Sequence, residues 1–177
     1  MNLVLIGYRG CGKSSVGRLV ARSLKAGFVD LDDRVREHLG GRTVAEIWQT
    51  DGEPAYRAAE VALTGQVLKL DHQIIALGGG TLMQDAARQA IVSADHTQRI
   101  YLACDPHVLH QRIDADRDSI TGRPALTTLG GGLDEIQQML KQRDPIYRAV
   151  ADKVIDVTAL TLEQTAQRVL AHLAAFS

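Results

Sequence analysis

The sequence is poor in cysteine, in aromatic residues and in charge of one sign. Its 2 cysteines, Cys11 and Cys104, are too few for a disulfide framework and lack the spacing of a metal site, so we expect reduced thiols. Aromatic residues make up 4% of the chain, which leaves few rings on which nucleic acid bases could stack. The formal net charge of -1 gives no field that would attract nucleic acid or an anionic membrane. We therefore expect small-molecule partners and no nucleic acid.

Long hydrophobic runs are also missing. The longest aliphatic stretches have about four residues, far below the roughly 18 that are needed to span a bilayer. Gly7 and Arg9 interrupt the apolar start of the chain, which disfavours a signal peptide, so we expect no membrane partner and a cytoplasmic location. The 177 residues contain no linker-like segment and fit a single domain over residues 1–177. We expect a monomer, because no apolar stripe in the sequence points to a dimer.

The most specific segment of the chain is GYRGCGKS, from Gly7 to Ser14. It fits the phosphate-loop pattern GxxxxGK[ST] at every fixed position. The aliphatic run at residues 3–6 precedes it, and apolar residues at helical spacing follow it between residues 13 and 25. A strand, a loop and a helix in this order disfavour a chance glycine-rich turn. The segment predicts that a nucleoside triphosphate binds with its phosphates at the start of the helix.

In a loop of this kind the backbone and two side chains have separate roles. Backbone N–H groups surround the phosphates, Lys13 reaches the terminal phosphates, and the Ser14 hydroxyl can ligate magnesium. Cys11 lies inside the loop, where it is either a reactive thiol or a small residue that fits. The residues expected to bind ATP here are Gly10, Cys11, Gly12, Lys13, Ser14 and Ser15.

Five short apolar runs alternate with longer segments of helical periodicity. The runs cover residues 3–6, 27–29, 73–77, 99–103 and 153–157. This alternation predicts an α/β fold with a parallel sheet and helices on both of its faces. Ligands of such sheets bind beyond the carboxyl ends of the strands, where the phosphate loop and two other motifs fall. These two motifs are residues 30–33 and 78–80.

The acidic segment FVDLDD places carboxylates directly after the second run. Strand-like alternation would direct Asp30 and Asp32 to the same side, toward the phosphate site. We assign Asp30 to Mg²⁺, which takes oxygen ligands, and Asp32 to the hydroxyl group of a phosphoryl acceptor. The alternative is that Asp32 or Asp33 only caps the helix that follows.

Two further motifs are ambiguous when they are considered singly. Arg57 lies about one turn into a helix that Glu53 and Pro54 begin, where it could bind an anionic ligand or pair with Glu53 or Glu60. Gly78–Gly80 would let backbone N–H groups approach a ligand closely, or would simply be a flexible strand exit.

The segment after the fourth run predicts a mobile lid at about residues 114–130. It has alternating charges, a glycine, a proline and no steady period, and a second LGGG element at residues 129–132 suits a hinge. Arg112, Arg117 and Arg123 lie in or beside this segment, and Arg143 lies on the helix after it. A lid arginine can stabilise charge on the transferring phosphoryl group, whereas a solvated charged loop is the alternative.

Taken together, the motifs GYRGCGKS, FVDLDD, IWQTDGEPAYRAAE, LGGG, GRPAL and RDPIYR resemble the shikimate kinase family. The resemblance covers nearly the whole chain, and TDGE followed by Tyr-Arg and then LGGG is specific to that family. It implies ATP-dependent phosphorylation of the 3-hydroxyl of shikimate, on the route to chorismate and the aromatic amino acids. It also implies the P-loop fold of the nucleoside monophosphate kinases, with a five-stranded parallel sheet in the order 2-3-1-4-5 and a closing lid.

The same resemblance implies roles for individual residues. Lys13, Asp32 and Arg123 would be catalytic, and Arg123 would also contact ATP. Ser14 and Asp30 would hold Mg²⁺. The residues implied for shikimate binding are Asp32, Arg57, Gly79, Gly80 and Arg143, with the two arginines gripping the carboxylate.

Two other functions compete with this interpretation. One is a different small-molecule kinase of the same fold, such as a gluconate or nucleotide kinase, which the combination of Asp30, Asp32 and Arg57 disfavours. The other is a catalytically silent nucleotide-binding module that regulates a partner. The presence of both Lys13 and Arg123 argues against the silent module.

Overall fold

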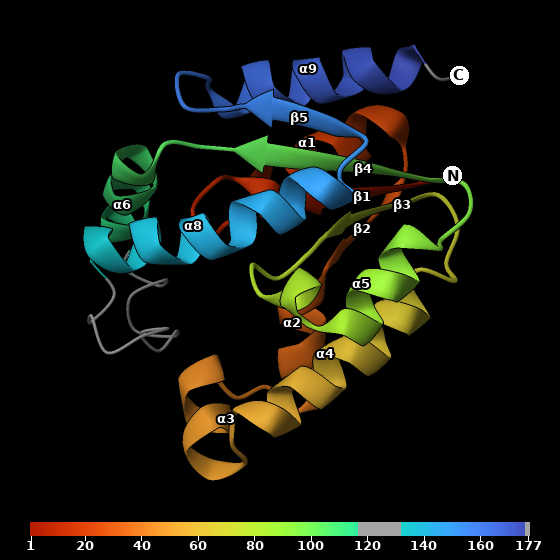
Figure 1. Ribbon diagram of the computed structural model, residues 1–177. Helices are drawn as coiled ribbons and strands as arrows, with labels where there is room; N and C mark the ends of the chain where they lie inside the picture. The colour runs from red at the N-terminus through yellow and green to blue at the C-terminus, as the bar shows by residue number, and fades with distance from the viewer. Residues whose placement is uncertain (117–131, 176–177) are drawn as a thin grey trace.

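The protein is described here from a computed structural model that covers residues 1–116 and 132–175 (Figure 1). Its centre is a five-stranded sheet in the order β2-β3-β1-β4-β5, and all neighbouring strands are parallel. The strands are β1 (Asn2–Ile6), β2 (Gly27–Asp30), β3 (Gln73–Ala76), β4 (Thr97–Ala103) and β5 (Lys153–Asp156). The α/β fold and the strand order expected from the sequence are confirmed.

Helices cover both faces of this sheet. They are α1 (Lys13–Leu24), α2 (Leu31–His38), α3 (Val44–Thr50), α4 (Glu53–Val67), α5 (Asp85–Val92), α6 (Pro106–Ala115), α8 (Leu133–Val150) and α9 (Leu162–Ala174), with a 3₁₀ turn η1 (Thr81–Met83). The α4 helix starts with Pro54 in its first turn, as the sequence predicts. The α6 helix continues to Ala115, so the first residues of the expected lid are helical, and residues 117–131 lie outside the described part of the chain.

The central strand β1 divides the core into two parts. Leu3 and Leu5 belong to the core that α1 and α9 close on one face, whereas Val4 and Ile6 belong to the core of α2 to α5 on the other. All of β1 is buried, because both faces of a parallel sheet are covered by helices. Figure 1 shows α1 and α9 on one side of the strands and α4 and α5 on the other.

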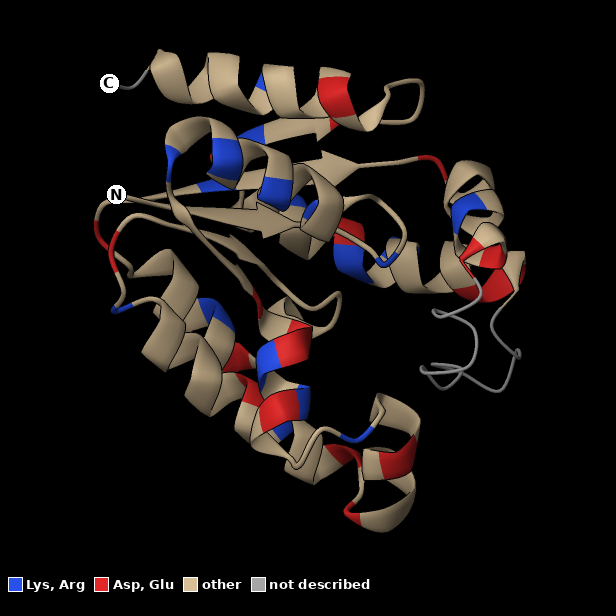
Figure 2. Ribbon diagram, turned by 180° about the vertical axis from the view of Figure 1, so that it is seen from behind, with Lys and Arg blue, Asp and Glu red and all other residues tan. Residues whose placement is uncertain are grey.

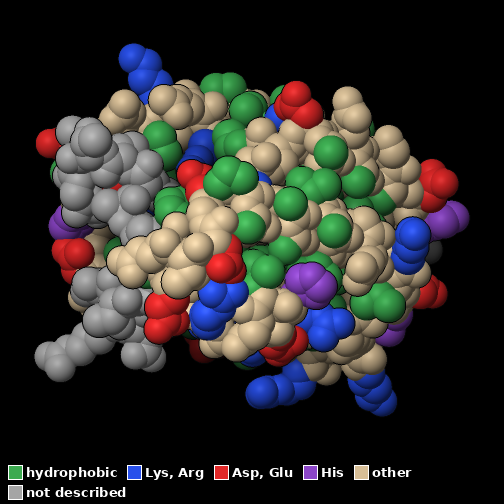
Figure 3. All heavy atoms as spheres, turned by 90° about the horizontal axis from the view of Figure 1, so that it is seen from below, with side chains coloured by type: hydrophobic (Ala, Val, Ile, Leu, Met, Phe, Trp, Pro, Cys, Tyr) green, Lys and Arg blue, Asp and Glu red, His purple; other side chains and the backbone are tan. Residues whose placement is uncertain are grey.

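Parallel strands place all their carboxyl ends at one edge of the sheet, and this edge positions the site. The phosphate loop follows β1, the acidic turn follows β2 and the glycine loop follows β3. Basic and acidic residues are interspersed along the helices (Figure 2), and side chains of both signs lie on the face seen from below (Figure 3). In the described part of the chain, no helix has both the length and the apolar character that crossing a membrane requires.

Candidate active site

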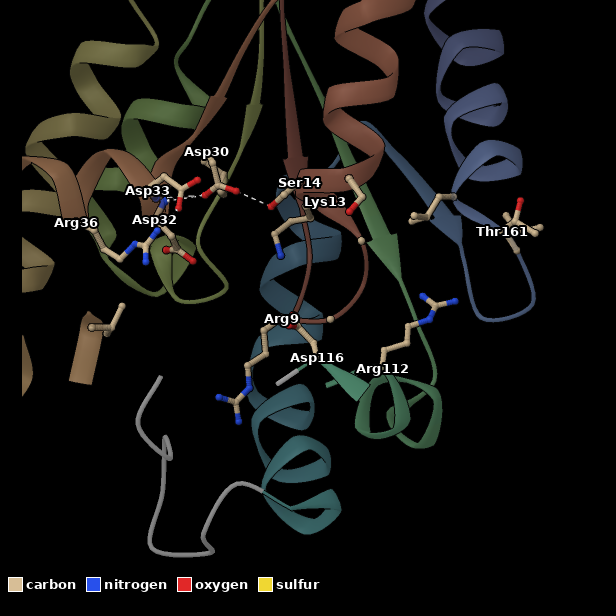
Figure 4. A pocket seen from close by; sticks show the side chains of 17 residues that line it. Arg9, Lys13, Ser14, Asp30, Asp32, Asp33, Arg36, Arg112, Asp116 and Thr161 are labelled. Carbon is tan, nitrogen blue, oxygen red and sulfur yellow. Dashed lines mark hydrogen bonds and ion pairs between the residues drawn. The ribbon is translucent and has the colours of Figure 1, made fainter. Parts of the chain in front are cut away.

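A cavity of about 650 Å³ opens at the carboxyl edge of the sheet (Figure 4). The phosphate loop lies at its centre, the acidic turn after β2 lies on one side, and Arg112 and Thr161 lie on the other. The residues predicted from the sequence that line the cavity are Gly10, Gly12, Lys13, Ser14, Ser15, Asp30 and Asp32. Three elements that are separate in the sequence therefore meet at one cavity.

The phosphate loop is shaped to present the start of α1. Gly12, the N-cap residue of α1, has φ 95°, a left-handed conformation that strains any residue with a Cβ. No side chain caps α1, so its first N–H groups remain available to an anion. The Lys13 Nζ donates hydrogen bonds to the carbonyl oxygens of Gly7 at 2.9 Å and of Tyr8 at 3.0 Å. The loop thus holds its lysine at the mouth of an anion site.

The Cys11 side chain is not part of the cavity. It is 2% exposed and packs in the core, and a Cβ built on Gly7 would lie 2.6 Å from its Sγ. A side chain at position 7 would therefore collide with Cys11. This packing agrees with the interpretation of Cys11 as a residue that fits, and leaves only its backbone beside the phosphate site.

Asp30 joins the acidic turn to the phosphate loop. Its Oδ1 accepts hydrogen bonds from the N–H groups of Asp32 at 3.1 Å and Asp33 at 3.4 Å, so it is the N-cap of α2. Its Oδ2 accepts a hydrogen bond of 2.5 Å from the Ser14 hydroxyl. The alternative considered from the sequence, that Asp32 or Asp33 caps the helix, is wrong, because Asp30 is the cap. The predicted strand alternation of Asp30 and Asp32 is also wrong, because Asp32 lies in the first turn of α2. Both carboxylates nevertheless line the cavity.

A hydroxyl and a carboxylate in contact suit a divalent cation. Magnesium is commonly held by one or two protein oxygens together with substrate phosphates. Ser14 and Asp30 supply these protein oxygens beside the phosphate loop. Among the described residues, no group of three or more His, Cys, Asp and Glu side chains could hold a metal ion without such help. The donor set therefore fits an ion that arrives with a nucleotide.

The glycine loop after β3 lies between Asp32 and Arg57. A Cβ built on Gly78 would be 2.4 Å from the Asp32 Oδ1, and one built on Gly80 would be 2.7 Å from the Arg57 Nη1. Side chains at these positions would displace either the carboxylate or the guanidinium. The sequence left open whether this loop contacts a ligand or is only a flexible strand exit, and the close packing against Asp32 and Arg57 argues against a flexible exit.

Arg57 is held in place by two carboxylates. Its Nη1 donates to Glu60 at 2.9 Å and its Nε donates to Glu53 at 3.1 Å, so both pairs considered from the sequence are present. Glu60 is fully buried and also accepts a hydrogen bond of 2.6 Å from Thr81. Burial raises the pKa of Glu60, and Asp32 adds to this effect, whereas Arg57 and Thr81 oppose it. These pairs are the alternative to ligand binding that the sequence offered, and they fix the guanidinium at the glycine loop.

Arg143 reaches the same loop from α8. Its Nη1 donates to the carbonyl oxygen of Gly79 at 3.0 Å, and the Tyr147 hydroxyl donates to the same oxygen at 2.5 Å. The predicted acceptor residues Arg57, Gly79, Gly80 and Arg143 are absent from the lining of the large cavity. They form a cluster beside it, and Gly78 connects that cluster to Asp32.

Residues 9–174 match the family model described as shikimate kinase. The chain belongs to the shikimate kinase family. A shikimate kinase of Rhodopirellula baltica is 37% identical over 169 residues, which cover 96% of this chain and 88% of that protein. The family predicted from the ordered motifs is confirmed.

Solved structures agree with this membership of the shikimate kinase family. The shikimate kinase of Acinetobacter baumannii, solved in complex with shikimate, has a TM-score of 0.89 at 28% identity and covers 99% of this chain and 94% of its own. A shikimate kinase from Bacteroides thetaiotaomicron has a TM-score of 0.84 at 26% identity, with 98% of each chain covered. A gluconokinase from Sinorhizobium meliloti has a TM-score of 0.62 at 21% identity, covers 99% of this chain and 92% of its own, and shares only the fold.

Several residues at the site of this shikimate kinase family member were not predicted from the sequence to be functional. Helical spacing could have found Tyr147, four residues after Arg143 in RDPIYR, because both side chains reach one carbonyl. No local signal marks Glu135, which pairs with Arg9 of the phosphate loop across 126 positions. The cavity also reaches Leu160, Thr161 and Leu162, to which the sequence analysis assigned no role. Arg117 and Arg123 lie outside the described residues.

Proposed function

We propose that this chain transfers the γ-phosphoryl group of ATP to the 3-hydroxyl of shikimate, giving shikimate 3-phosphate and ADP, through the residues gathered at the carboxyl edge of the sheet. The reaction belongs to the route to chorismate and the aromatic amino acids. The observation that carries this proposal is the joining of a phosphate loop to Asp32 and to a cluster with two arginines, Arg57 and Arg143. A hydroxylated carboxylate requires this combination of a hydroxyl acceptor and cationic groups.

On the donor side, the start of α1 and Lys13 receive the phosphates. The N–H groups of the loop and the helix dipole stabilise negative charge without reorganisation during the reaction. Ser14 and Asp30 would hold a divalent ion, which we propose is Mg²⁺. When bound, such an ion neutralises charge on the phosphate oxygens and orients them.

On the acceptor side, Asp32 accepts the hydrogen bond of the reacting hydroxyl and orients it or takes its proton. The Tyr56 hydroxyl donates to the Asp32 Oδ1 at 3.1 Å, which restrains the carboxylate. Arg57 and Arg143 grip the shikimate carboxylate, and the backbone of Gly79 and Gly80 borders the ring. This division places the acceptor between a fixed carboxylate and fixed cations.

Other parts of the proposal reach beyond the described residues. We propose a single domain over residues 1–177 with a lid at about residues 114–130. Arg123 in that lid would contact ATP and stabilise charge on the transferring group. We also propose that the protein works as a monomer in the cytoplasm, where its co-substrate ATP is available.

The proposal is tested by ADP release from ATP and Mg²⁺ with shikimate, gluconate or a nucleoside monophosphate as acceptor, beside a reaction without acceptor. We expect turnover with shikimate alone and its loss when the divalent ion is chelated. Turnover with another acceptor would retain the phosphate-loop assignment and overturn the arginine clamp. Tight ATP binding without any turnover would instead support a silent nucleotide-binding module.

A further inference from the structure

A buried ion pair connects the phosphate loop to α8. The Arg9 Nη2 lies 3.1 Å from the Glu135 Oε1, and the two side chains are 10% and 0% exposed. Figure 4 shows the Arg9 side chain directed away from Ser14 and running beside α8. The donor and acceptor roles assigned above use neither residue, although Arg9 also lines the cavity. A charged pair with this degree of burial fixes geometry strongly, because each charge depends on its partner after leaving water.

The tyrosine before Arg9 brings this pair close to the acceptor site. Tyr8 is 1% exposed, and its ring centroid lies 5.9 Å from the Arg9 guanidinium carbon and 5.7 Å from that of Arg143. Gly79 lies against the same loop, since a Cβ built on it would be 3.5 Å from the backbone nitrogen of Arg9. The phosphate loop therefore contacts both the start of α8 and the surroundings of Arg143.

The α8 helix is held at two places along its buried face. Glu135 in its first turn binds Arg9, and about two and three turns later Arg143 and Tyr147 bind the carbonyl oxygen of Gly79. One anchor belongs to the loop that receives ATP, and the other belongs to the loop at the acceptor cluster. With both anchors in place, the helix cannot rotate or tilt without breaking a buried hydrogen bond.

We propose that Arg9 and Glu135 are positioning residues for the phosphoryl acceptor: their ion pair fixes α8 against the phosphate loop and thereby sets the position of Arg143. This inference rests on the proposed function, because it assigns Arg143 to the carboxylate of shikimate. Loss of the pair allows the start of α8 to shift while the N–H groups of α1 and Lys13 stay in place. The affinity for shikimate is then affected far more than the affinity for ATP.

The test uses the variants Arg9→Met, Glu135→Gln and the double variant in the full chain. Methionine keeps a long side chain for packing, and glutamine keeps the shape of glutamate. We expect each single variant to raise the KM for shikimate roughly tenfold while the KM for ATP stays within about twofold of its original value. The double variant should resemble the single ones, because both residues act through one interaction.

Arg99→Met is the matched control. Arg99 pairs with Asp152 at 2.9 Å, and this pair links β4 to the start of β5 at the edge opposite the site. The Arg99→Met variant should lower the melting temperature without changing the KM for shikimate or the KM for ATP. A lower melting temperature with unchanged KM in the Arg9 and Glu135 variants would show a purely structural pair and overturn the inference.

Three other results would also overturn it. Effects that multiply in the double variant would mean that the residues act separately, and an equal rise in both KM values would mean general damage to the site. An effect of Arg9→Met without a comparable effect of Glu135→Gln would mean that Arg9 acts on a ligand directly. Failure of the proposed function is recognised separately, since the unmodified protein would then lack shikimate-dependent ADP release, and the inference would fail with it.

Discussion

The donor and acceptor halves of the site are built in different ways. The donor half is nearly continuous in sequence, and its lysine bonds to carbonyl groups only five and six residues away. The acceptor half combines residues from α2, α4, the loop after β3 and α8, and the hydrogen bonds that connect these elements join positions 21 to 68 residues apart. One short motif is enough to form a phosphate site from backbone N–H groups, whereas the side chains of the acceptor site are brought together only by the whole fold.

The two halves also differ in how they use charge. The donor half relies on N–H groups and one lysine, which an arriving phosphate neutralises. Both halves contain buried charged side chains, Lys13 in the donor half and Glu60 and Arg143 in the acceptor half. In the acceptor half, however, Arg57 is already paired with Glu53 and Glu60. Buried charges that are paired in advance are rigid but vulnerable, because the loss of one partner leaves the other uncompensated.

The largest effect is expected when the donor half loses its lysine. Lys13→Met should lower kcat on the order of 10³-fold, because the variant removes a preorganised positive charge from the phosphates. Initial rates at saturating ATP and shikimate measure this effect. Lys25→Met, at the opposite end of α1, is the control and should keep normal turnover. A loss below about tenfold would show that backbone N–H groups suffice without the lysine.

The matching change in the acceptor half is Asp32→Asn. It should lower kcat on the order of 10²- to 10³-fold, because an amide cannot take a proton from the hydroxyl. ATP affinity, measured by equilibrium binding, should hardly change. Asp33→Asn should have a much smaller effect, since Asp33 also lines the cavity but is already paired with Arg36 at 2.7 Å. Equal losses in both variants would remove the special role of Asp32.

Arg57→Lys distinguishes a bidentate clamp from a simple positive charge. The lysine keeps a cation opposite Glu60 but loses the planar fork, so the KM for shikimate should rise roughly 10- to 100-fold. Steady-state kinetics with each substrate varied in turn provide the measurement. Arg88→Lys on α5 serves as the control. If only the KM for ATP rises, the carboxylate site has been placed in the wrong half.

Asp30 belongs to both halves, and two variants separate its roles. Asparagine is also a good N-cap, so Asp30→Asn should preserve the melting temperature and raise the Mg²⁺ concentration for half-maximal rate roughly tenfold. Asp30→Ala should lower stability as well, because the first N–H groups of α2 lose their acceptor. A normal Mg²⁺ dependence in both variants would contradict the metal role.

The smallest effect concerns the pH dependence of stability at Glu60. Burial raises the pKa of Glu60 in the folded state, so that state binds more protons than the unfolded chain between the ordinary and the raised pKa. The stabilising contribution of this proton is present at low pH and is lost as pH rises through the raised pKa. Urea denaturation over this range should show a shallower decline for Glu60→Gln than for the unmodified protein. Parallel curves would show that Glu60 titrates normally.

Much of the fold was predictable because its signals are local. Each of the five apolar runs became a strand, and the phosphate loop, with its flanking strand and helix, needed only residues that are neighbours in the chain. The acidic turn shows the limit of such reasoning. Asp30 and Asp32 do face one cavity, but a helix cap brings them together, because the chain leaves the strand at Asp30.

Short-range order and ordered motifs were enough to predict the phosphate loop, the alternation of strands and helices and the family. Folding was needed to show that Glu135 pairs with Arg9, that Tyr147 joins Arg143 at Gly79, and that Arg57 is held by two carboxylates at once. The neighbours of a side chain in the sequence do not indicate which partner folding will bring to it from another helix or strand. A buried charge acquires its partner only when the packing around it is complete.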